Sequence, residues 1–572
     1  MRFCGLLLFL ALAEAREPLP AAAIDPLFPY QWNLLNTGQR AGIVPGEDID
    51  IQGAWTGDPQ TGRPPLTGAG INVSILDNGV QLDHPDLADN IEPSAPFDPL
   101  DPARLDLDLI DNDGNAWPAQ NEHGTTVAGT VAAAGLNDRG IIGIAYRAGI
   151  VPVRVFGAPS QTTDEMLHSA LLHRVDENTT ANPGPGLVDV ANASWFIEPW
   201  VTPVPLGPRS REALEEGTGR GRNGRGIVYV FSADHGGHFV NDMSDDWFFN
   251  DGDLNLNGYA SSRFTIAVGP SDGQGRPTFY HEPGSGLLIS APSSFLRREV
   301  GEFVDWAQDF VTLYSTAPFP AFVPVPELPQ PEAGLYSWFC GGASHAAAQV
   351  TGVVALMLEL SPTLTWRDVQ HILVRTAEQS GPPLPPSPGP PGPDFDAEGW
   401  QRTAGGHWFS HGLGFGRVNA TGAVAMAHTW VNLPAATPLT ASSEGAVVIP
   451  DGSASGASAE ITLFNADGLR AEAIEVTITG LSHPHHGDLE IDLVSPGGTR
   501  SRLMHARPQA EVSLSGWLFT TVAHWDEDPG GPWRLEIRDR SSAVPGNGTL
   551  TGWTLTVHGH QPPPGPAGLL MN

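Results

Sequence analysis

The sequence predicts an α/β domain with a mostly parallel sheet flanked by helices, followed by a smaller all-β sandwich. From about residue 25 to 430, short apolar runs typical of buried strands alternate with helical patterns, and this alternation favours a parallel sheet. After about residue 432, runs of alternating polarity rich in Thr, Val and Gly replace the helices. With 40% hydrophobic and only 16% charged residues, the 572-residue chain can bury sizeable cores.

The individual elements of the first part follow from these patterns. We expect strands over 71–76, 226–231 and 264–268, and helices over 124–134, 345–360 and 421–428. The later sandwich should include strands over 474–478 and 553–557. In parallel α/β sheets the chemistry gathers where the strands end, and the first strand ends directly before Asp77.

A Pro-rich run over 381–393 interrupts the first part. We expect it to be an inserted surface loop, because the helical pattern at 421–428 still belongs to the α/β alternation. The first domain then spans 16–432 and the sandwich spans 433–559. Residues 560–572 form a Pro- and Gly-rich tail in which we expect no regular structure.

The N-terminus is typical of a secretory signal peptide over residues 1–15. Arg2 supplies a positive charge, an apolar run follows over 3–13, and Ala13-Glu14-Ala15 is a small-x-small cleavage site. The apolar run is too short to span a bilayer, and we identify no later run of about 18 uncharged apolar residues. We therefore expect a chain exported to the extracellular space, the periplasm or a secretory lumen, without a transmembrane anchor.

Charge and cysteine content narrow the possible partners. The 29 basic and 64 acidic side chains give a formal net charge of −35, which argues against nucleic-acid binding because such binding relies on cations that neutralise phosphates. Cys4 and Cys340 are the only cysteines, so no internal disulfide is expected once a signal peptide is removed. Bound cations would suit this acidic chain as a substitute stabiliser.

Three separate segments hold the residue types of a nucleophilic hydrolase. Asp77 ends an apolar strand, His123 precedes a glycine at a helix start, and Ser344 opens another helix. A serine hydroxyl needs a base to take its proton, and that base needs a carboxylate to fix its tautomer. Each residue alone is more simply a cap or turn residue; the ordered set predicts a catalytic triad.

The chain resembles known families over nearly its whole length after the N-terminal run. Residues 25–430 resemble the subtilisin-like serine endopeptidases, most closely the kexin/furin branch, which shares the chain order Asp, His, Ser. Residues 433–559 resemble the P domain of that branch, a jelly-roll-like sandwich. The matching motifs include Asp25-Pro26-Leu27-Phe28, His84-Pro85-Asp86-Leu87, Asn121 to Gly129, Ser194-Trp195, Asn257-Gly258-Tyr259, Gly341 to Ala348, Leu364 to His371, Asp488 to Thr499, His524 to Trp533 and Gly548 to Trp553.

This resemblance implies a secreted serine endopeptidase that acts on proteins or peptides. Ser344 would attack the peptide carbonyl, His123 would transfer the proton, and Asp77 would orient His123. His235 would help to stabilise the oxyanion together with the backbone N–H of Ser344. The P domain would pack against the peptidase domain.

The resemblance also implies bound Ca²⁺. A first site would join the side chains of Asp25, Asp86 and Asn137 to the backbone oxygens of Ala134, Arg139 and Ile141. A second site would use Asp108, Asp111 and Asp113, for which a solvated acidic loop is an equally good interpretation.

Several positions depart from the family pattern. His235 replaces an oxyanion-hole Asn, Ala343 replaces a Thr and Ala348 replaces a Pro. About ten residues separate Ala15 from Asp25, fewer than an inhibitory propeptide needs. These features favour an alternative, a pseudoprotease that serves as a secreted binding scaffold.

The positions that govern substrate preference also depart from the family pattern. Strict dibasic convertases carry carboxylates at four positions where this chain has uncharged residues. These are Asn78, Gln120, Pro199 and Asn257. A convertase with dibasic specificity therefore stays a second alternative.

Overall fold

The computed structural model describes thirteen stretches with side chains and three short strands by backbone alone. The described residues are 25–40, 42–92, 107–108, 123–156, 162–175, 187–195, 203–234, 252–278, 280–293, 297–299, 302–304, 312–313, 335–337, 341–381, 399–507 and 513–561, with only the backbone described for 107–108, 297–299, 302–304 and 313. The expected signal peptide, nearly all of the Pro-rich run and the last eleven residues lie outside them.

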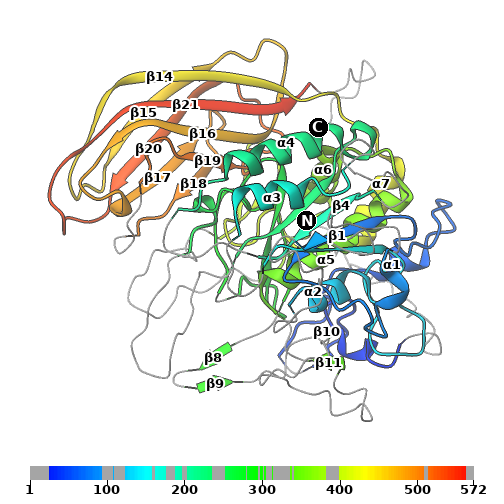
Figure 1. Ribbon diagram of the computed structural model, residues 1–572. Coiled ribbons are helices and arrows are strands. Elements are labelled where there is room, and N and C mark those ends of the chain that lie inside the picture. The colour runs from blue at the N-terminus through cyan, green and yellow to red at the C-terminus, as the bar shows by residue number, and fades with distance from the viewer. Residues whose placement is uncertain are drawn as a thin grey trace, which may run out of the picture.

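The first domain, here called the α/β domain, is built on a seven-stranded sheet of order β2-β3-β1-β4-β5-β6-β7, in which all neighbours are parallel. Figure 1 shows this domain beside the second one, in which long strands predominate. The strands of the seven-stranded sheet are β1 (Asn72–Asp77), β2 (Leu107–Asp108), β3 (Gly149–Arg154), β4 (Val190–Ala193), β5 (Val228–Ser232), β6 (Thr265–Ser271) and β7 (Ile289–Pro292). The chain leaves β1 toward β3 on one side and later returns to β4 on the other. Such a change of direction opens a crevice at the carboxyl ends of the strands.

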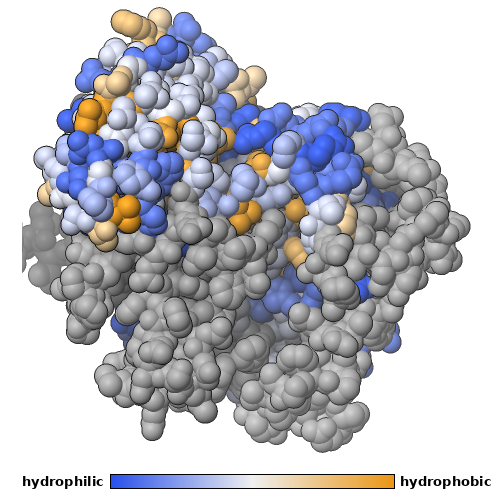
Figure 2. All heavy atoms as spheres, turned by 60° about the vertical axis from the view of Figure 1, so that its left-hand side comes forward, coloured by the Kyte–Doolittle hydropathy of each residue, from blue (hydrophilic) through white to orange (hydrophobic). Residues whose placement is uncertain are grey.

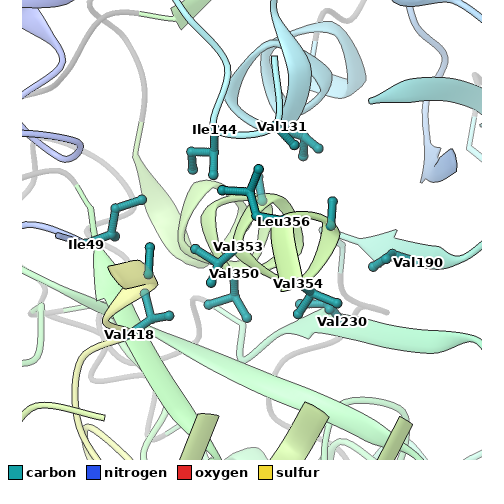
Figure 3. Close-up of a cluster of buried hydrophobic side chains, with 14 of the residues drawn as sticks. Ile49, Val131, Ile144, Val190, Val230, Val350, Val353, Val354, Leu356 and Val418 are labelled. Carbon is teal, nitrogen blue, oxygen red and sulfur yellow. The ribbon is translucent and has the colours of Figure 1, made fainter. Parts of the chain in front are cut away.

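Alternating side chains place one hydrophobic core on each face of the sheet. Val228 and Val230 of β5 face the core that surrounds α5, whereas Tyr229 and Phe231 face the core beneath α3 and α4. Figure 3 shows Val350, Val353 and Val354 of α5 packed among apolar side chains of several other elements. The helices are α1 (Gln52–Thr56), α2 (His123–Ala132), α3 (Asp164–Leu171), α4 (Pro208–Gly224), α5 (Gly342–Leu360), α6 (Trp366–Thr376) and α7 (Ala420–Thr429).

Polar residues fix where several helices begin. Thr365 and Asp368 form a capping box at α6, and the Asn419 side chain accepts a hydrogen bond from Gly422 N at α7. Three short antiparallel pairs complete the α/β domain. They join β8 (Arg297–Glu299) to β9 (Glu302–Val304), β10 (Thr312–Leu313) to β11 (Tyr336–Ser337), and β12 (Gln401–Arg402) to β13 (Trp408–Phe409).

The second domain, here called the sandwich, consists of two four-stranded antiparallel sheets. Their orders are β14-β21-β16-β19 and β15-β20-β17-β18, and the core between them includes Trp533, Trp553 and Phe519. The strands are β14 (Thr437–Ile449), β15 (Ala457–Leu463), β16 (Arg470–Ser482), β17 (Leu489–Val494), β18 (Arg500–Met504), β19 (Leu518–Thr521), β20 (Gly531–Asp539) and β21 (Gly548–His560). β21 thus includes His560, the first residue of the expected tail.

The two domains pack tightly against each other. Trp525 of the sandwich belongs to the same buried cluster as α5 and α6, and Leu256 of the α/β domain belongs to the sandwich core. The Asn255 amide donates to the carbonyl oxygens of Arg502 and Leu503, each at 3.0 Å.

On the described part of the surface in Figure 2, exposed apolar residues lie in small separate groups among hydrophilic ones.

The structure confirms the expected strands and helices with small shifts of their ends. The predicted strand 71–76 is β1, the predicted helix 124–134 is α2, and the predicted helix 345–360 is α5. By length and composition, α5 is also apolar enough to span a membrane, although His345, Gln349 and Glu359 interrupt its apolar run. Its most apolar window is 89% buried inside the described structure, as in the core helix of a folded domain.

Candidate active site

Asp77 lies at the carboxyl end of β1, where the sheet changes direction. It is 2% exposed, and one of its carboxylate oxygens accepts a hydrogen bond from Asn78 N at 2.8 Å. The Asn78 side chain in turn accepts from Gly124 N at 2.9 Å and so ties the end of β1 to the start of α2.

His123 is the first residue of α2 and faces this carboxylate. Its Nδ1–H donates to Oδ1 of Asp77 at 3.0 Å and to Oδ2 at 2.9 Å. A side chain at Gly124 could not be accommodated, because its Cβ would lie 2.2 Å from the carbonyl oxygen of Gly79. Burial favours the neutral imidazole, but the charge and the hydrogen bond of Asp77 raise the pKa of His123 overall.

Ser344 lies in the first turn of α5 and is 3% exposed. Its hydroxyl donates to the carbonyl oxygen of Ser194 at 3.2 Å, and the Ser194 hydroxyl donates to the carbonyl oxygen of Ser344 at 2.8 Å. This reciprocal pair holds the nucleophile candidate against the end of β4, the strand next to β1.

The imidazole of His345 links the Ser344 turn to His123. The centroids of the two histidine rings lie 6.4 Å apart in an edge-to-face arrangement. The Nδ1–H of His345 donates to the carbonyl oxygen of Gly341 at 2.7 Å. The three residues predicted as a triad therefore converge at one edge of the sheet, with Asp77 and His123 in direct contact and the Ser344 hydroxyl directed at Ser194.

Two further residues hold the turn before Ser344. Gly342 N donates to the hydroxyl of Tyr280 at 3.1 Å, and the hydroxyl of Ser293 donates to the carbonyl oxygen of Gly342 at 2.9 Å. Sequence reasoning gave neither residue a role, because a lone Tyr and a lone Ser in loops carry no local signal. Only the packing of β7 beside α5 brings them to this turn.

The expected oxyanion residue, His235, lies outside the described residues. The chain reaches it through Ala233, whose N–H donates to the carbonyl oxygen of Val268 at 2.9 Å, and through Asp234, which is buried and has φ 75°. Since β5 lies beside β4, this turn follows the same edge of the sheet as Asp77 and Ser194.

The first predicted cation site brings together the residues that the sequence proposed. Asp25 is 1% exposed, and its carboxylate accepts from the N–H groups of Leu136, Asn137 and Asp138 at 2.7, 2.9 and 3.0 Å. Asp86 is fully buried and accepts from the Asn137 amide at 2.8 Å and from Ile141 N at 3.2 Å. The loop that carries Ala134, Arg139 and Ile141 therefore connects the two carboxylates.

The two carboxylates of this site have no cationic partner among the described residues. Arg139, in the loop itself, donates to the carbonyl oxygen of Pro85 at 3.3 Å instead. Within the described part of the chain, no arginine or histidine side chain forms an ion pair with Asp25 or Asp86. Burial, together with the charge of Asp25, raises the pKa of Asp86 to about 7, and burial also raises the pKa of Asp25. The second predicted cation site lies outside this description: Asp111 and Asp113 are not described, and only the backbone of Asp108 is, as part of β2.

The positions expected to govern substrate preference are described in part. Asn78 holds Gly124, and the Asn257 side chain accepts from Tyr259 N at 3.1 Å and Ala260 N at 3.2 Å, so both amides stabilise turns. Gln120 and Pro199 lie outside the described residues.

Comparison with known proteins agrees with this geometry. A family model described as the subtilase family matches residues 68–416, and one described as the proprotein convertase P-domain matches residues 471–557. Neuroendocrine convertase 2 of Homo sapiens is 31% identical over 560 residues, which cover 94% of this chain and 75% of the human protein. A PC3-like endoprotease, variant B, of Hydra vulgaris is 32% identical over 542 residues, 90% of this chain and 63% of that protein.

A solved structure shares the fold. The serine protease of Aeromonas sobria superposes with a TM-score of 0.77 at 23% identity, and the match covers 96% of this chain and 97% of that one. The chain therefore belongs to the subtilase family of serine endopeptidases and carries a proprotein-convertase P domain as its second domain.

Proposed function

We propose that this chain is an exported, calcium-dependent serine endopeptidase that hydrolyses peptide bonds with Asp77, His123 and Ser344. One observation carries the proposal: both oxygens of a buried carboxylate pair with Nδ1 of His123, beside the helix turn that presents Ser344. Export rests on the expected signal peptide at residues 1–15 and awaits its own test, the N-terminal sequence of the mature protein.

The proton path follows from the contacts of the imidazole. Because Nδ1–H donates to Asp77, the neutral ring carries its lone pair on Nε2, which serves as the general base. The Ser344 hydroxyl must turn from the carbonyl oxygen of Ser194 toward this nitrogen before it attacks the peptide carbonyl. The raised pKa of His123 then favours the imidazolium that later protonates the leaving amine.

Oxyanion stabilisation is assigned to His235 and the backbone N–H of Ser344. Removing one side-chain donor from such a hole costs about 10²- to 10³-fold in turnover, as in the subtilisin example of this effect. We expect His235→Ala to lower turnover by this factor and His235→Asn to retain most of it, measured with a peptide substrate.

Calcium is assigned to the Asp25–Asp86 site (Asp25, Asp86, Asn137 and the loop 134–141). A bound divalent cation would supply the positive charge that two neighbouring buried carboxylates lack. The two carboxylates and the backbone oxygens of the loop are the oxygen ligands that Ca²⁺ requires. The Asn137 oxygen now accepts from Arg139 N at 2.9 Å, so it would reach the cation only after the amide turns and this bond breaks. The site would tie the N-terminal arm to the end of α2.

A fluorophosphonate probe in calcium buffer tests the hydrolase proposal. We expect the probe to label Ser344, Ser344→Ala to abolish labelling, and Asp77→Asn to slow it by about 10⁴-fold, because the wrong tautomer leaves Nε2 protonated. Asp467→Asn, which changes an exposed carboxylate of the sandwich, should label at the normal rate. A wild-type chain that folds but is never labelled would instead support the binding-scaffold alternative.

A convertase of dibasic specificity is the second candidate, favoured by the likeness to neuroendocrine convertase 2. Against it, Asn78 and Asn257 carry no charge that could pair with a substrate arginine or lysine. Cleavage of a peptide library decides: enrichment of paired basic residues before the scissile bond supports the convertase, and no enrichment removes it.

A further inference from the structure

We infer that Tyr336 is a positioning residue that couples occupancy of the Asp25–Asp86 site to the placement of His123 at the start of α2. The inference rests on the function proposed above. Tyr336 lies in β11, eight residues before Ser344, and belongs to none of the motifs that identified either site.

The Tyr336 side chain is held within the cation site. Its hydroxyl donates to Oδ2 of Asp86 at 3.2 Å, and the residue is 1% exposed. Its ring meets the ring of His84 edge to face, with centroids 6.0 Å apart. The phenol also packs against Gly140, where a Cβ would lie 2.1 Å from the phenolic oxygen. Gly140 is therefore required by this ring as well as by its own φ of 41°.

The backbone around Tyr336 is tied to the same site. The His84 Nε2–H donates to the carbonyl oxygen of Leu335 at 3.1 Å, and the His84 Nδ1 accepts from Asp86 N at 3.1 Å. The short segment 335–337 is thus attached to Asp86 twice, once through the Tyr336 phenol and once through the His84 ring.

The other side of this segment contacts the helix of the general base. β11 pairs with β10, in which the Thr312 hydroxyl donates to the carbonyl oxygen of Thr126 at 3.0 Å. Thr126 lies in the first turn of α2, and its own hydroxyl donates to the carbonyl oxygen of His123 at 2.7 Å. Segment 335–337 therefore connects Asp86, through β10, to the start of α2 and to His123.

This arrangement makes two sites mechanically dependent on one another. Asp86 cannot shift without moving Tyr336 or breaking its hydrogen bond, because the ring is enclosed by His84 and Gly140. Whatever fixes Asp86 therefore also fixes the β10–β11 pair that holds the start of α2. Coupling of this kind is reciprocal, so a ligand on Ser344 must change the affinity of the cation site by the same factor.

The test measures calcium affinity before and after Ser344 is occupied. Protein is modified with a fluorophosphonate, and the dissociation constant of Ca²⁺ is obtained for modified and unmodified protein by competition with a chelating dye. We expect modification to tighten calcium binding about fivefold or more in the wild type. In Tyr336→Phe, which keeps the ring and removes the hydroxyl, this ratio should fall toward one.

A matched control is available in β5. Tyr229 is also buried, its hydroxyl donates to the carbonyl oxygen of Leu171 at 2.7 Å, and it packs on Gly217, whose Cβ would lie 1.9 Å from the phenolic oxygen. Tyr229→Phe should therefore lose a comparable buried hydrogen bond while keeping the wild-type affinity ratio. His84→Asn, which retains an acceptor for Asp86 N and loses the bond to Leu335, should lower the ratio as Tyr336→Phe does.

The outcomes separate this inference from the proposed function. A wild type that binds no calcium, or whose Ser344 is never modified, defeats the proposed function. A wild type that does both but shows equal affinities before and after modification overturns the coupling alone. A Tyr336→Phe variant that keeps the full wild-type affinity ratio also overturns the coupling. If Tyr336→Phe does not fold, the same outcome in His84→Asn overturns it.

Discussion

The Asp25–Asp86 site and a cluster between the two domains both bury carboxylates, and they balance the charge in opposite ways. In the second, here called the Glu472 cluster (Arg367, His371, Glu472 and His560), Arg367 of α6 binds both oxygens of Glu472 at 2.8 and 2.5 Å. The His371 Nε2 lies 3.2 Å from the same carboxylate, and the Nδ1 of His560 lies 2.8 Å from it. Among the described residues, Asp25 and Asp86 receive only backbone, amide and phenol donors.

The pKa values reflect this difference. Burial disfavours every one of these carboxylates, but hydrogen bonds from His371, His560 and Arg367 hold the pKa of Glu472 well below its usual range. At Asp86 the neutral donors do not offset burial, and the pKa rises to about 7. The cluster is therefore complete in charge, whereas the Asp25–Asp86 site is incomplete among the described residues, which supports the cation proposed for it.

The same logic decides against a metal in the Glu472 cluster. His371, Glu472 and His560 offer ligand atoms within 4.8 Å of one another. The guanidinium of Arg367 already occupies the carboxylate, however, and Nδ1 of His371 accepts from the Trp525 indole at 3.1 Å. The cluster therefore works as a lock between the domains, since Glu472, His560 and Trp525 belong to the sandwich.

The largest expected effect on stability comes from removing the positively charged side chain of Arg367 from the Glu472 cluster. Arg367→Met leaves Glu472 buried without its main partner, and we expect a loss of about 3–5 kcal/mol in the free energy of unfolding. Denaturant titration followed by tryptophan fluorescence measures it. The double variant Arg367→Met/Glu472→Leu should recover most of the loss, and a double variant as unstable as the single one would contradict this account.

Calcium removal should have the next largest effect on stability, and this effect should depend on the Asp25–Asp86 site alone. A ligand at a hundred times its dissociation constant stabilises the folded state by about 2.7 kcal/mol. We therefore expect calcium to raise the unfolding temperature of the wild type. The unfolding temperature of the Asp86→Asn variant should be nearly the same with and without calcium. Arg367→Met should keep the full calcium-dependent shift, and loss of that shift would show that the two regions are not independent.

A smaller effect should appear as a dependence on pH at the complete cluster. Burial lowers the pKa of His371 below 6.5 despite Glu472 and Asp526, while His560 adds to the lowering. The unfolded chain then binds a proton near pH 6.5 that the folded chain refuses, so stability is full above this pH and is lost as the pH falls below it.

The loss should be at most about 1.4 kcal/mol per pH unit for this one group. His371→Asn keeps an acceptor for Trp525 and cannot titrate, so its stability should change less between pH 7 and pH 5 than that of the wild type. Denaturation midpoints at several pH values measure the difference; equal slopes would remove His371 as the cause.

The smallest effect on stability is expected at an ion pair on the protein surface. Glu216 and Arg220 of α4 form an i,i+4 ion pair on the helix surface. Such pairs contribute about 0.3–0.5 kcal/mol, because water already solvates both charges. Arg220→Gln should shift the unfolding midpoint barely above experimental error, and a loss comparable to that of Arg367→Met would contradict the role given to burial.

Much of the fold could be predicted from local patterns. The apolar runs that became β1, β5 and β6 and the long apolar helix α5 follow from composition and periodicity, which any short segment carries within itself. The switch to alternating polarity near residue 432 likewise marks the sandwich. Hydropathy averaged over α5 would also allow a membrane span, because a core helix and a spanning helix both bury an apolar surface; its burial in the fold distinguishes the two.

The candidate site was predicted to a similar degree. Asp77, His123 and Ser344 were identified from three short motifs, and so were Asp25, Asp86 and Asn137. Tyr280, Ser293 and Tyr336 could not be found in this way, because their contacts with the site are hydrogen bonds to residues distant in the chain.

By itself, the sequence determined which side chains can perform chemistry, since reactivity depends on residue type and the short glycine-rich contexts that expose it. Tertiary structure alone decided which buried charges are balanced. A carboxylate costs the same to bury whatever its neighbours in sequence, and only folding brought Arg367 to Glu472 while leaving Asp25 and Asp86 with neutral donors.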